Sequence, residues 1–417
     1  MNLRCLLALA LAGACGAVPV SGRAAEPLRL QDAIARALGS NPSIAAEQAQ
    51  LQAVQAKAQR EGLPTAYTVV GDVENIVGTG ALSGFKSAET TLRLGRVLEL
   101  GGKREARQAL GAAEVSQQQN QADNSRVQIA SRTATRFIEV VADQRRLAYA
   151  QERVKQAGRT RREVASWVAA ARNPESNLRA AEIAVAEAEL EREHAEHELL
   201  SARMTLASSW GSFEPDFASA VGELDALPPV EPFESLVAKL PTTPEQRANL
   251  LEAETIAARR RVAQAAAKPD LSVSLGVRRL EALDDQGLVL SVSMPLGSRQ
   301  RSIFSVAEAD AQLAALSARG DAMRYERHQE LFKLYQELGH ARLEAETLRK
   351  TMIPKAEQAV AFNRRGFEAG NFSYLTLAQS QRTLSDLRER ATKALARYHT
   401  LLVEVERLTA AARDATP

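Results

Sequence analysis

The sequence predicts a mainly helical protein with a small β part, in which long antiparallel helices accompany four strands. Three observations predict this fold class. Four stretches alternate apolar and polar residues with the period of two that a strand shows when its two faces differ in surroundings. Most of the remaining chain is rich in Ala, Leu, Glu, Gln and Arg, which favour long helices packed through small side chains. The same order of elements occurs twice, which indicates an internal repeat of roughly 200 residues.

Residues 1–24 have the features of a secretory signal peptide. Arg4 precedes an apolar run that is too short and too rich in Ala and Gly for a spanning helix, and Gly22-Arg23-Ala24 provides small residues at a cleavage site. Cleavage there removes both cysteines and two arginines, which takes the formal charge from +2 to 0. Cys15 allows another interpretation, because the Leu-Ala-Gly-Ala before it approaches the pattern that precedes a lipidated cysteine in bacterial lipoproteins. Otherwise Cys15 is a small apolar residue of a discarded peptide.

Length and composition exclude several classes. The 417 residues suffice for two or three domains, and 45% hydrophobic with 25% charged residues is ordinary for a folded protein. The formal charge of +2 provides no strong basic field, so binding to nucleic acid is not expected. Beyond the N-terminal run, no segment approaches 18 consecutive apolar residues, and no transmembrane helix is expected.

Each repeat is expected to begin with helices, one of which starts at a proline after a polar cap, as at Asn41-Pro42 and Thr243-Pro244. A hairpin, a corner with glycine and arginine, a very long helix, a tight turn and a return helix follow. The first repeat, 25–210, is expected to contain helices 30–62, strands 65–77 and 88–100, and helices 102–172 and 176–209. The second, 233–417, is expected to contain helices 233–267, strands 270–279 and 287–296, and helices 299–367 and 373–411. The linker 211–232 is rich in Pro, Gly and acidic residues.

The four strands carry apolar residues on one face and mostly polar residues on the other, which is typical of a membrane barrel with a wet interior. Each has about 9–12 residues, enough to cross the hydrocarbon when tilted. A half-buried sheet in a soluble protein alternates in the same way, so that alternative stays open. Arg96 interrupts the apolar face near the corner, where it can reach the headgroup level by snorkelling. The residues expected to face lipid are Val69, Val73, Leu92, Leu94, Leu271, Val273, Leu275, Leu288, Leu290 and Val292.

Four strands are too few to close a barrel in lipid. Open sheet edges inside hydrocarbon leave backbone N–H and C=O groups unpaired, at several kcal/mol for each group. The chain must therefore bury these edges within its own fold or pair them with strands from identical copies.

The helices that follow the corners are unusually long. From Gly102 to Arg172 the chain has roughly 70 residues without proline, which corresponds to about 100 Å of helix. The matching helix of the second repeat contains Pro354, which should kink it. Such helices need partners along their whole length, and the return helix and the helix that opens each repeat could provide them when stacked end to end.

Several short motifs occur in a fixed order along the two repeats: Leu30-Gln31-Asp32-Ala33-Ile34, Ala37-Leu38, Asn41-Pro42, Leu98-Glu99-Leu100-Gly101-Gly102-Lys103-Arg104, Ile353-Pro354-Lys355-Ala356, Phe367-Glu368-Ala369-Gly370, Leu375 and Ala378-Gln379. In the order, spacing and duplication of these motifs, the chain resembles the TolC-type outer-membrane efflux channels over nearly all of the mature sequence. The corner Leu98–Arg104 is most similar to the heavy-metal cation branch, the CzcC-like channels.

The resemblance implies a homotrimer in which three copies contribute four strands each to one twelve-stranded barrel in outer-membrane lipid. It also implies a hollow α-barrel in the periplasm, a periplasmic adaptor that docks at the helical tip, and an inner-membrane pump, usually an RND transporter. The chain would then be a passive exit duct for divalent heavy-metal cations. Two alternatives stay open: the same architecture serving drugs or type I protein secretion, and a soluble periplasmic coiled-coil scaffold.

The resemblance also assigns the two turns at the end of the long helices to adaptor docking. These residues are Asn173, Pro174, Glu175, Ser176, Gly370, Asn371, Phe372 and Ser373. Gly, Asn and Pro form turns in any protein, so their role can be conformational as well. Some members of the family narrow the entrance aperture with acidic residues, but the matching positions here hold Thr376 and Gln379, and an acidic ring is not expected.

The sequence contains no nucleophile–base signature, phosphate-binding loop or paired catalytic carboxylates, so neither enzymatic activity nor a cofactor is expected. His194 and His197 lie one helical turn apart among glutamates and could hold a transition metal. The alternative is a solvated helix face in a segment dense in Glu and Arg. A conduit needs weak, distributed contacts, so the absence of a ligand cluster is compatible with metal efflux.

Overall fold

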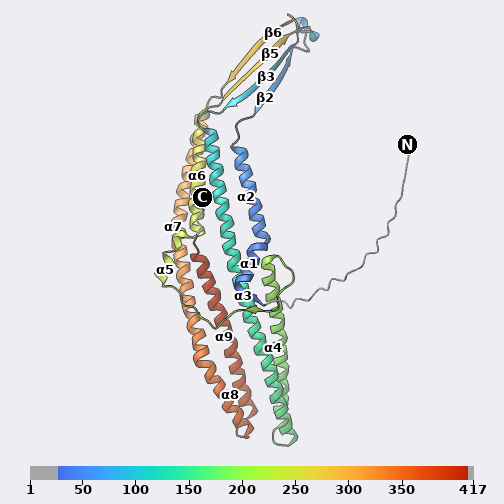
Figure 1. Cartoon of the computed structure of the whole chain (residues 1–417), viewed down its shortest axis with the longest axis vertical. Helices are drawn as coiled ribbons and strands as arrows, with labels where there is room; N and C mark the ends of the chain where they lie inside the picture. Colours follow the sequence, from blue (N-terminus) through green and yellow to red (C-terminus); the bar gives the residue numbers. More distant parts are fainter. Residues whose placement is uncertain (1–26, 412–417) are drawn as a thin grey trace, which may run out of the picture.

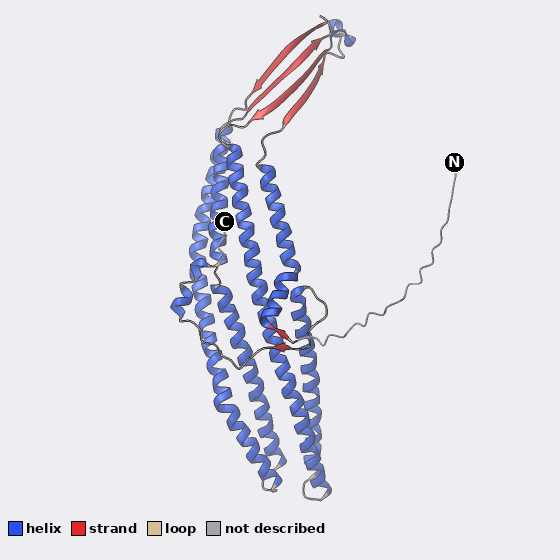
Figure 2. Cartoon of the chain, viewed as in Figure 1, coloured by secondary structure: helices blue, strands red, loops and turns tan. Residues whose placement is uncertain are grey.

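The computed structural model describes residues 27–411, which form one elongated molecule with helices along its length and a sheet at one end (Figures 1 and 2). The predicted signal peptide 1–24 and Cys15 lie outside the described residues. The predicted fold class, mainly α with a small β part, is confirmed. The first half comprises β1 (Leu28–Arg29), α1 (Leu30–Ser40), α2 (Pro42–Glu61), β2 (Tyr67–Glu74), β3 (Glu89–Leu98), α3 (Lys103–Ala169) and α4 (Glu175–Ala207).

The second half has the same order of long elements. It comprises β4 (Ala220–Val221), α5 (Phe233–Val237), α6 (Pro244–Ala265), β5 (Leu271–Leu280), β6 (Asp285–Ser293), α7 (Ser298–Thr347), α8 (Ile353–Glu368) and α9 (Tyr374–Thr409). Short 3₁₀ turns lie at Gly80–Leu82, Gly84–Ser87, Ser208–Trp210 and Leu240–Thr242. No helix within residues 27–411 has the length and apolar character that crossing a bilayer requires.

Local chemistry explains where the helices begin. The Asn41 side chain accepts a hydrogen bond from the Ser43 N–H at 2.8 Å, and Pro42 occupies the first position of α2. Thr243 occupies the same cap position before Pro244 and α6. Gly102 and Gly297 precede α3 and α7 with positive φ, so the chain turns sharply from a strand into each long helix.

Each long helix packs against two shorter ones that follow each other along its length (Figure 1). Near the sheet α3 contacts α2, and towards the other end it contacts α4. In the second half, α7 contacts α6 and α9, and α8 contacts α9. Helix α3 also contacts α6 and α9, which joins the two halves. The largest buried cluster lies midway along the helices and includes Phe137, Val140, Leu206, Phe217 and Leu395.

The predicted helix 299–367 is interrupted in the structure. Helix α7 ends at Thr347, a π-helical turn follows at Leu348–Met352, and α8 begins at Ile353. Pro354 has no N–H and cannot bond to the carbonyl one turn earlier, so a regular α-helical ladder cannot continue through this point. The π turn, which is wider than an α-helical turn, occupies the five residues immediately before α8. Its first residue, Leu348, packs in the central core.

The four strands form one antiparallel sheet in the order β2-β3-β5-β6. The pairing of β3 with β5 joins the two halves of the chain, and the sequence analysis did not specify this pairing. One continuous row of the register contains Val69, Leu94, Leu275 and Leu290. Because side chains alternate along a strand, this register places all ten predicted lipid-facing residues on the same face of the sheet.

The strand ends differ from the predicted ones. Strand β2 ends at Glu74 because Asn75 has a φ of 57°, which takes the chain out of the extended conformation. Strand β6 spans Asp285–Ser293, whereas the sequence predicted 287–296. Pro295 has no N–H to contribute to a ladder, so the last three residues of the predicted strand lie outside the sheet.

The linker 211–232 crosses the middle of the helices and is held there by Asp225. Its carboxylate accepts two hydrogen bonds from Arg145 of α3, at 3.0 and 2.8 Å. Its backbone carbonyl accepts a hydrogen bond from Arg349 of the π turn at 2.6 Å. Since Arg145 and Arg349 belong to different halves, Asp225 ties the two halves together at the middle of the molecule.

Replacing Asp225 by Asn is expected to lower stability near neutral pH, by about 1 kcal/mol or less because the side chain is half exposed. Burial acts to raise the pKa of the Asp225 carboxyl, but the hydrogen bond and charge of Arg145, with the charges of Arg349 and His399, hold that pKa below its usual value. The contribution is therefore present above about pH 4 and is lost as the pH falls further. Melting temperatures of wild type and variant should differ at pH 7 and converge in acid; an unchanged difference in acid would exclude this charge effect.

Candidate functional site

Two turns lie together at the end of the molecule opposite the sheet (Figure 1). Between α3 and α4, Ala171 has a φ of 56°, and the Arg172 N–H bonds to the Trp167 carbonyl at 2.8 Å. Between α8 and α9, Gly370 has a φ of 75°, and the Asn371 N–H bonds to the Gly366 carbonyl at 2.8 Å. Each turn thus closes its helix with a left-handed residue whose neighbour bonds back to the last helical turn.

Several of the predicted tip residues hold these turns in shape. The Ser373 hydroxyl caps α9 by accepting a hydrogen bond from the Thr376 N–H at 3.2 Å, and the two hydroxyls lie 3.0 Å apart. Asn173 accepts a hydrogen bond from the Asn177 side-chain amide at 2.6 Å. The predicted aperture residue Thr376 therefore has a conformational role at the start of α9.

A compact aromatic cluster packs the two turns together. The Trp167 and Phe367 rings lie 4.4 Å apart between centroids, and the Phe367 and Tyr374 rings lie 6.3 Å apart. Val164 and Leu377 complete the buried centre, so residues from α3, α8 and α9 share one core. The sequence analysis named Phe367 as part of a motif but did not predict that these aromatic rings pack together. Their signal was available, because aromatic residues make up only 4% of the chain and three of them flank the two turns.

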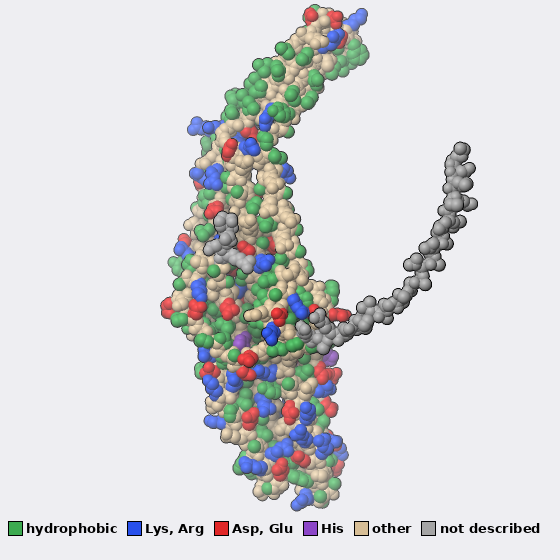
Figure 3. Space-filling model, viewed as in Figure 1, with side chains coloured by type: hydrophobic (Ala, Val, Ile, Leu, Met, Phe, Trp, Pro, Cys, Tyr) green, Lys and Arg blue, Asp and Glu red, His purple; other side chains and the backbone are tan. Residues whose placement is uncertain are grey.

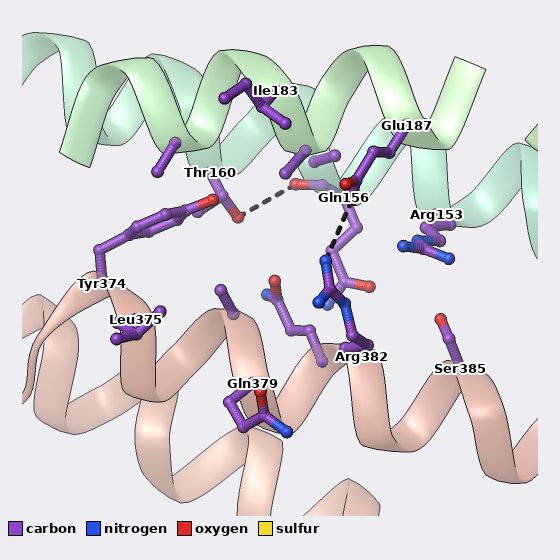
Figure 4. Close-up of a pocket in the computed structure, with 15 residues that line it drawn as sticks. Arg153, Gln156, Thr160, Ile183, Glu187, Tyr374, Leu375, Gln379, Arg382 and Ser385 are labelled. Carbon is purple, nitrogen blue, oxygen red and sulfur yellow. Dashed lines mark hydrogen bonds and ion pairs between the residues drawn. The ribbon is translucent and has the colours of Figure 1, made fainter. Parts of the chain in front are cut away.

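Two ion pairs join helices from the two halves of the chain above this cluster. Arg364 of α8 lies 3.4 Å from the Glu163 carboxylate of α3. Arg382 of α9 lies 3.1 Å from the Glu187 carboxylate of α4 (Figure 4). The two helical hairpins therefore contact each other at the tip. Few polar side chains take part in this contact.

A groove of about 250 Å³ lies between α3, α4 and α9 (Figure 4). The predicted aperture residue Gln379 lines it, together with Tyr374, Arg382 and Glu187. Burial, and then the charge of Glu187, raise the pKa of the Tyr374 hydroxyl, so this residue stays neutral at physiological pH. A second groove of about 180 Å³ continues along the same helices and shares Arg153 with the first.

The two histidines singled out from the sequence pair with different glutamates. His194 Nε2 lies 3.2 Å from Glu198, and His197 Nε2 lies 3.9 Å from Glu193. Within residues 27–411, no group of three or more His, Cys, Asp and Glu side chains is arranged to hold a metal ion. The structure does not bring the two histidines together as ligands of one site.

The sheet at the other end has two chemically different faces. Apolar side chains cover the visible part of one face (Figure 3), and Val69, Leu288 and Leu290 there are each more than two thirds exposed. The opposite face carries charged pairs, including Arg93 with Asp72 and Arg278 with Glu89 at 2.9 Å. This distribution matches a strand surface with lipid on one side and water on the other.

Comparisons with known proteins agree with this geometry. The chain is 31% identical to the cobalt-zinc-cadmium resistance protein CzcC of Cupriavidus metallidurans over 397 residues, which cover 94% of this chain and 92% of CzcC. The structure resembles the outer-membrane protein VceC of Vibrio cholerae, with a TM-score of 0.76, 16% identity, and coverage of 92% of this chain and 97% of VceC. It also resembles CusC, with a TM-score of 0.73, 13% identity, and coverage of 93% of each chain. No protein-family profile matches the chain.

The relationship to CzcC extends over nearly the whole of both chains, and the structural likeness to outer-membrane channels covers the sheet as well as the helices. The protein is accordingly an outer-membrane channel component with a large periplasmic part, and not an enzyme. The chain belongs to the TolC-type outer-membrane efflux channels, in the branch that contains CzcC.

Proposed function

We propose that this outer-membrane efflux channel is the passive exit duct of a tripartite system that exports divalent heavy-metal cations. The observation that carries the cargo assignment is the 31% identity to a cobalt-zinc-cadmium resistance protein over nearly the full length. An inner-membrane RND pump would supply the energy, and a periplasmic adaptor would join pump and duct. The lack of a tight metal site among the described residues agrees with a duct, in which strong binding would slow the flow.

The open edges of the sheet support a homotrimer. Among residues 27–411, strands β3 and β5 have a neighbour on each side, whereas β2 and β6 have one neighbour each and expose an unpaired edge. Such edges are costly in hydrocarbon, and pairing β6 of one copy with β2 of the next would satisfy them. Three copies would then form a barrel of twelve strands whose outer surface includes the apolar residues from Val69 to Val292.

The two turns at the far end are proposed as the docking site for the adaptor. They are the most distant part of the described chain from the sheet, and Asn371 and Glu175 are exposed there (Figure 1). The aperture positions Thr376 and Gln379 carry no charge, so cation selection would not depend on an acidic ring at these positions.

A strain in which this gene is deleted tests the cargo. It should become more sensitive to cobalt, zinc and cadmium salts, with little change towards dyes and antibiotics, and the intact gene should restore resistance. Increased sensitivity to drugs alone would favour the drug channel, and loss of a secreted polypeptide would favour type I secretion. Unchanged sensitivity to all metals would contradict the proposal.

Replacing Gly370 by Val is expected to reduce metal resistance. A β-branched residue is strained at a φ of 75°, although the space around Gly370 is open, and strain of roughly 1–2 kcal/mol would distort the turn. Asn tolerates this conformation better, so Gly370→Asn should retain more resistance. Resistance is compared at equal amounts of outer-membrane protein. Full resistance of the Val variant would remove Gly370 from the docking site.

A further inference from the structure

We propose that the periplasmic rim of the sheet carries a basic collar that binds the phosphate groups of anionic phospholipids. The collar consists of Arg96, Lys268, Arg299 and Arg301. The proposal depends on the outer-membrane location of the protein and not on its cargo, its pump or its adaptor. It assigns a lipid-binding role to charged residues at or near the strand ends, which have no part in the tip.

Arg96 has an unusual position for a charged side chain. It lies in the same register row as Tyr67, Val273 and Val292, on the apolar face of the sheet and two residues from the end of β3. Its guanidinium lies 4.9 Å from the centre of the Tyr67 ring, and its Nε donates to the Thr65 carbonyl at 3.1 Å. Aromatic and cationic side chains of this kind occur where hydrocarbon meets headgroups, because one part of each prefers lipid and the other prefers water.

The other three cations lie just beyond the same strand ends. Lys268 is three residues before β5, and its side chain packs against Gly101 at the corner that follows β3. Arg299 and Arg301 lie in the first turn of α7, shortly after β6 ends. All four residues therefore lie at the end of the sheet that adjoins the long helices, in a strand end or in segments that shortly precede or follow a strand. Lys and Arg side chains are visible around this junction in Figure 3.

The carboxylates nearest the collar already have partners. Asp270 accepts a hydrogen bond from Lys103 at 2.6 Å, and Glu99 accepts one from Arg107 at 3.0 Å. In the described part of the chain, none of the four collar side chains forms an ion pair with a carboxylate. Glu105, in the first turn of α3, is the acidic residue nearby that has no ion pair among the described residues. The rim thus has a surplus of positive charge that its own acidic residues do not balance.

The opposite rim of the sheet provides an internal comparison. Arg279 also lies on the apolar face, near the other end of β5. It forms ion pairs with Glu281 at 2.7 Å and Asp284 at 2.9 Å. An outward arginine is therefore neutralised within the chain at one rim and left without a carboxylate at the other. The rim next to the long helices thus leaves an outward arginine available for an external anion, and the continuous apolar face beside it indicates that this anion belongs to a lipid.

Lipid retention by the purified full-length channel tests the proposal. Wild type and the variant with all four residues changed to Gln are transferred to mild detergent, incubated with phosphatidylglycerol or phosphatidylcholine, and analysed by native mass spectrometry. Wild type should retain phosphatidylglycerol preferentially, and the variant should lose this preference. Each cation near a charged membrane surface contributes a factor of about five in affinity at low salt, so the combined change should be large.

The matched control removes four exposed cations of α3 far from the sheet, Lys155, Arg159, Arg161 and Arg162, and should retain the lipid as wild type does. If the fourfold collar variant fails to assemble, Arg96→Gln alone should weaken retention by about fivefold, and Arg96→Lys should restore most of it. Equal retention by wild type and either collar variant would overturn the proposal. Equal retention of phosphatidylglycerol and phosphatidylcholine by wild type would also overturn it, because the collar would then not select anionic lipid.

Discussion

Replacing Leu290 by Arg is expected to prevent assembly of the channel in the outer membrane. Leu290 lies in the row with Val69, Leu94 and Leu275, near the centre of the apolar face, and its side chain is 68% exposed. A charge at the middle of the hydrocarbon costs roughly 2–4 kcal/mol on the lipid face of a barrel strand. In a homotrimer every copy would carry this penalty. Membrane fractions analysed for oligomers by chemical cross-linking should contain little or no assembled variant.

The neighbouring residue supplies the control for this experiment. Ser291 is paired with Ser274 and points to the opposite, polar face of the sheet. Ser291→Arg introduces the same side chain one position away, and it should assemble far better than Leu290→Arg because the new charge meets water. Normal oligomers of Leu290→Arg, or equal loss of both variants, would contradict the assignment of the two faces.

Replacing Gly276 by Ala is expected to disrupt the pairing of β3 with β5, which connects the two halves of the sheet. Gly276 lies opposite Arg93 in the pairing of β5 with β3. A methyl group there would overlap the carbonyl oxygen of Leu92 and would lie 2.8 Å from the Cα of Arg93, and the backbone cannot move away without loss of the pairing. Overpacking of this kind costs typically 1–3 kcal/mol and can cost more where backbone atoms are involved.

Gly287→Ala is the matched control, because Gly287 lies in the adjacent strand β6 and its added methyl group would meet no atom within 4 Å. The control should assemble like wild type, while Gly276→Ala should lower both the amount of assembled channel and its resistance to heat in detergent. Equal behaviour of the two variants would show that the close contact between β3 and β5 does not hold in the membrane.

Periodicity made much of this architecture predictable. Alternation along Leu271–Leu280 and the long proline-free segment after Gly102 are local patterns, and they predict strands and helices without knowledge of the tertiary structure. Turn residues such as Gly370 are similarly visible, because a left-handed position favours glycine. For the same reason, the apolar face of the sheet could be named residue by residue before its register was known.

Contacts between distant segments could not be predicted in this way. The pairing of β3 with β5 joins residues more than 170 positions apart, and neither strand specifies its partner by composition. The ion pair of Arg382 with Glu187 and the anchoring of Asp225 by Arg145 and Arg349 also depend on how the two halves pack. Charged residues are abundant in these helices, so the sequence alone does not show which of them meet.

The mass of the purified mature protein is the most direct test of whether a single chain needs further copies to pair the edges of its sheet. Strands β2 and β6 each leave one edge unpaired in the described chain. We therefore expect light scattering, corrected for bound detergent, to give the mass of three copies, and we expect the protein to aggregate when detergent is removed. A monodisperse single copy in plain buffer would contradict the trimeric channel.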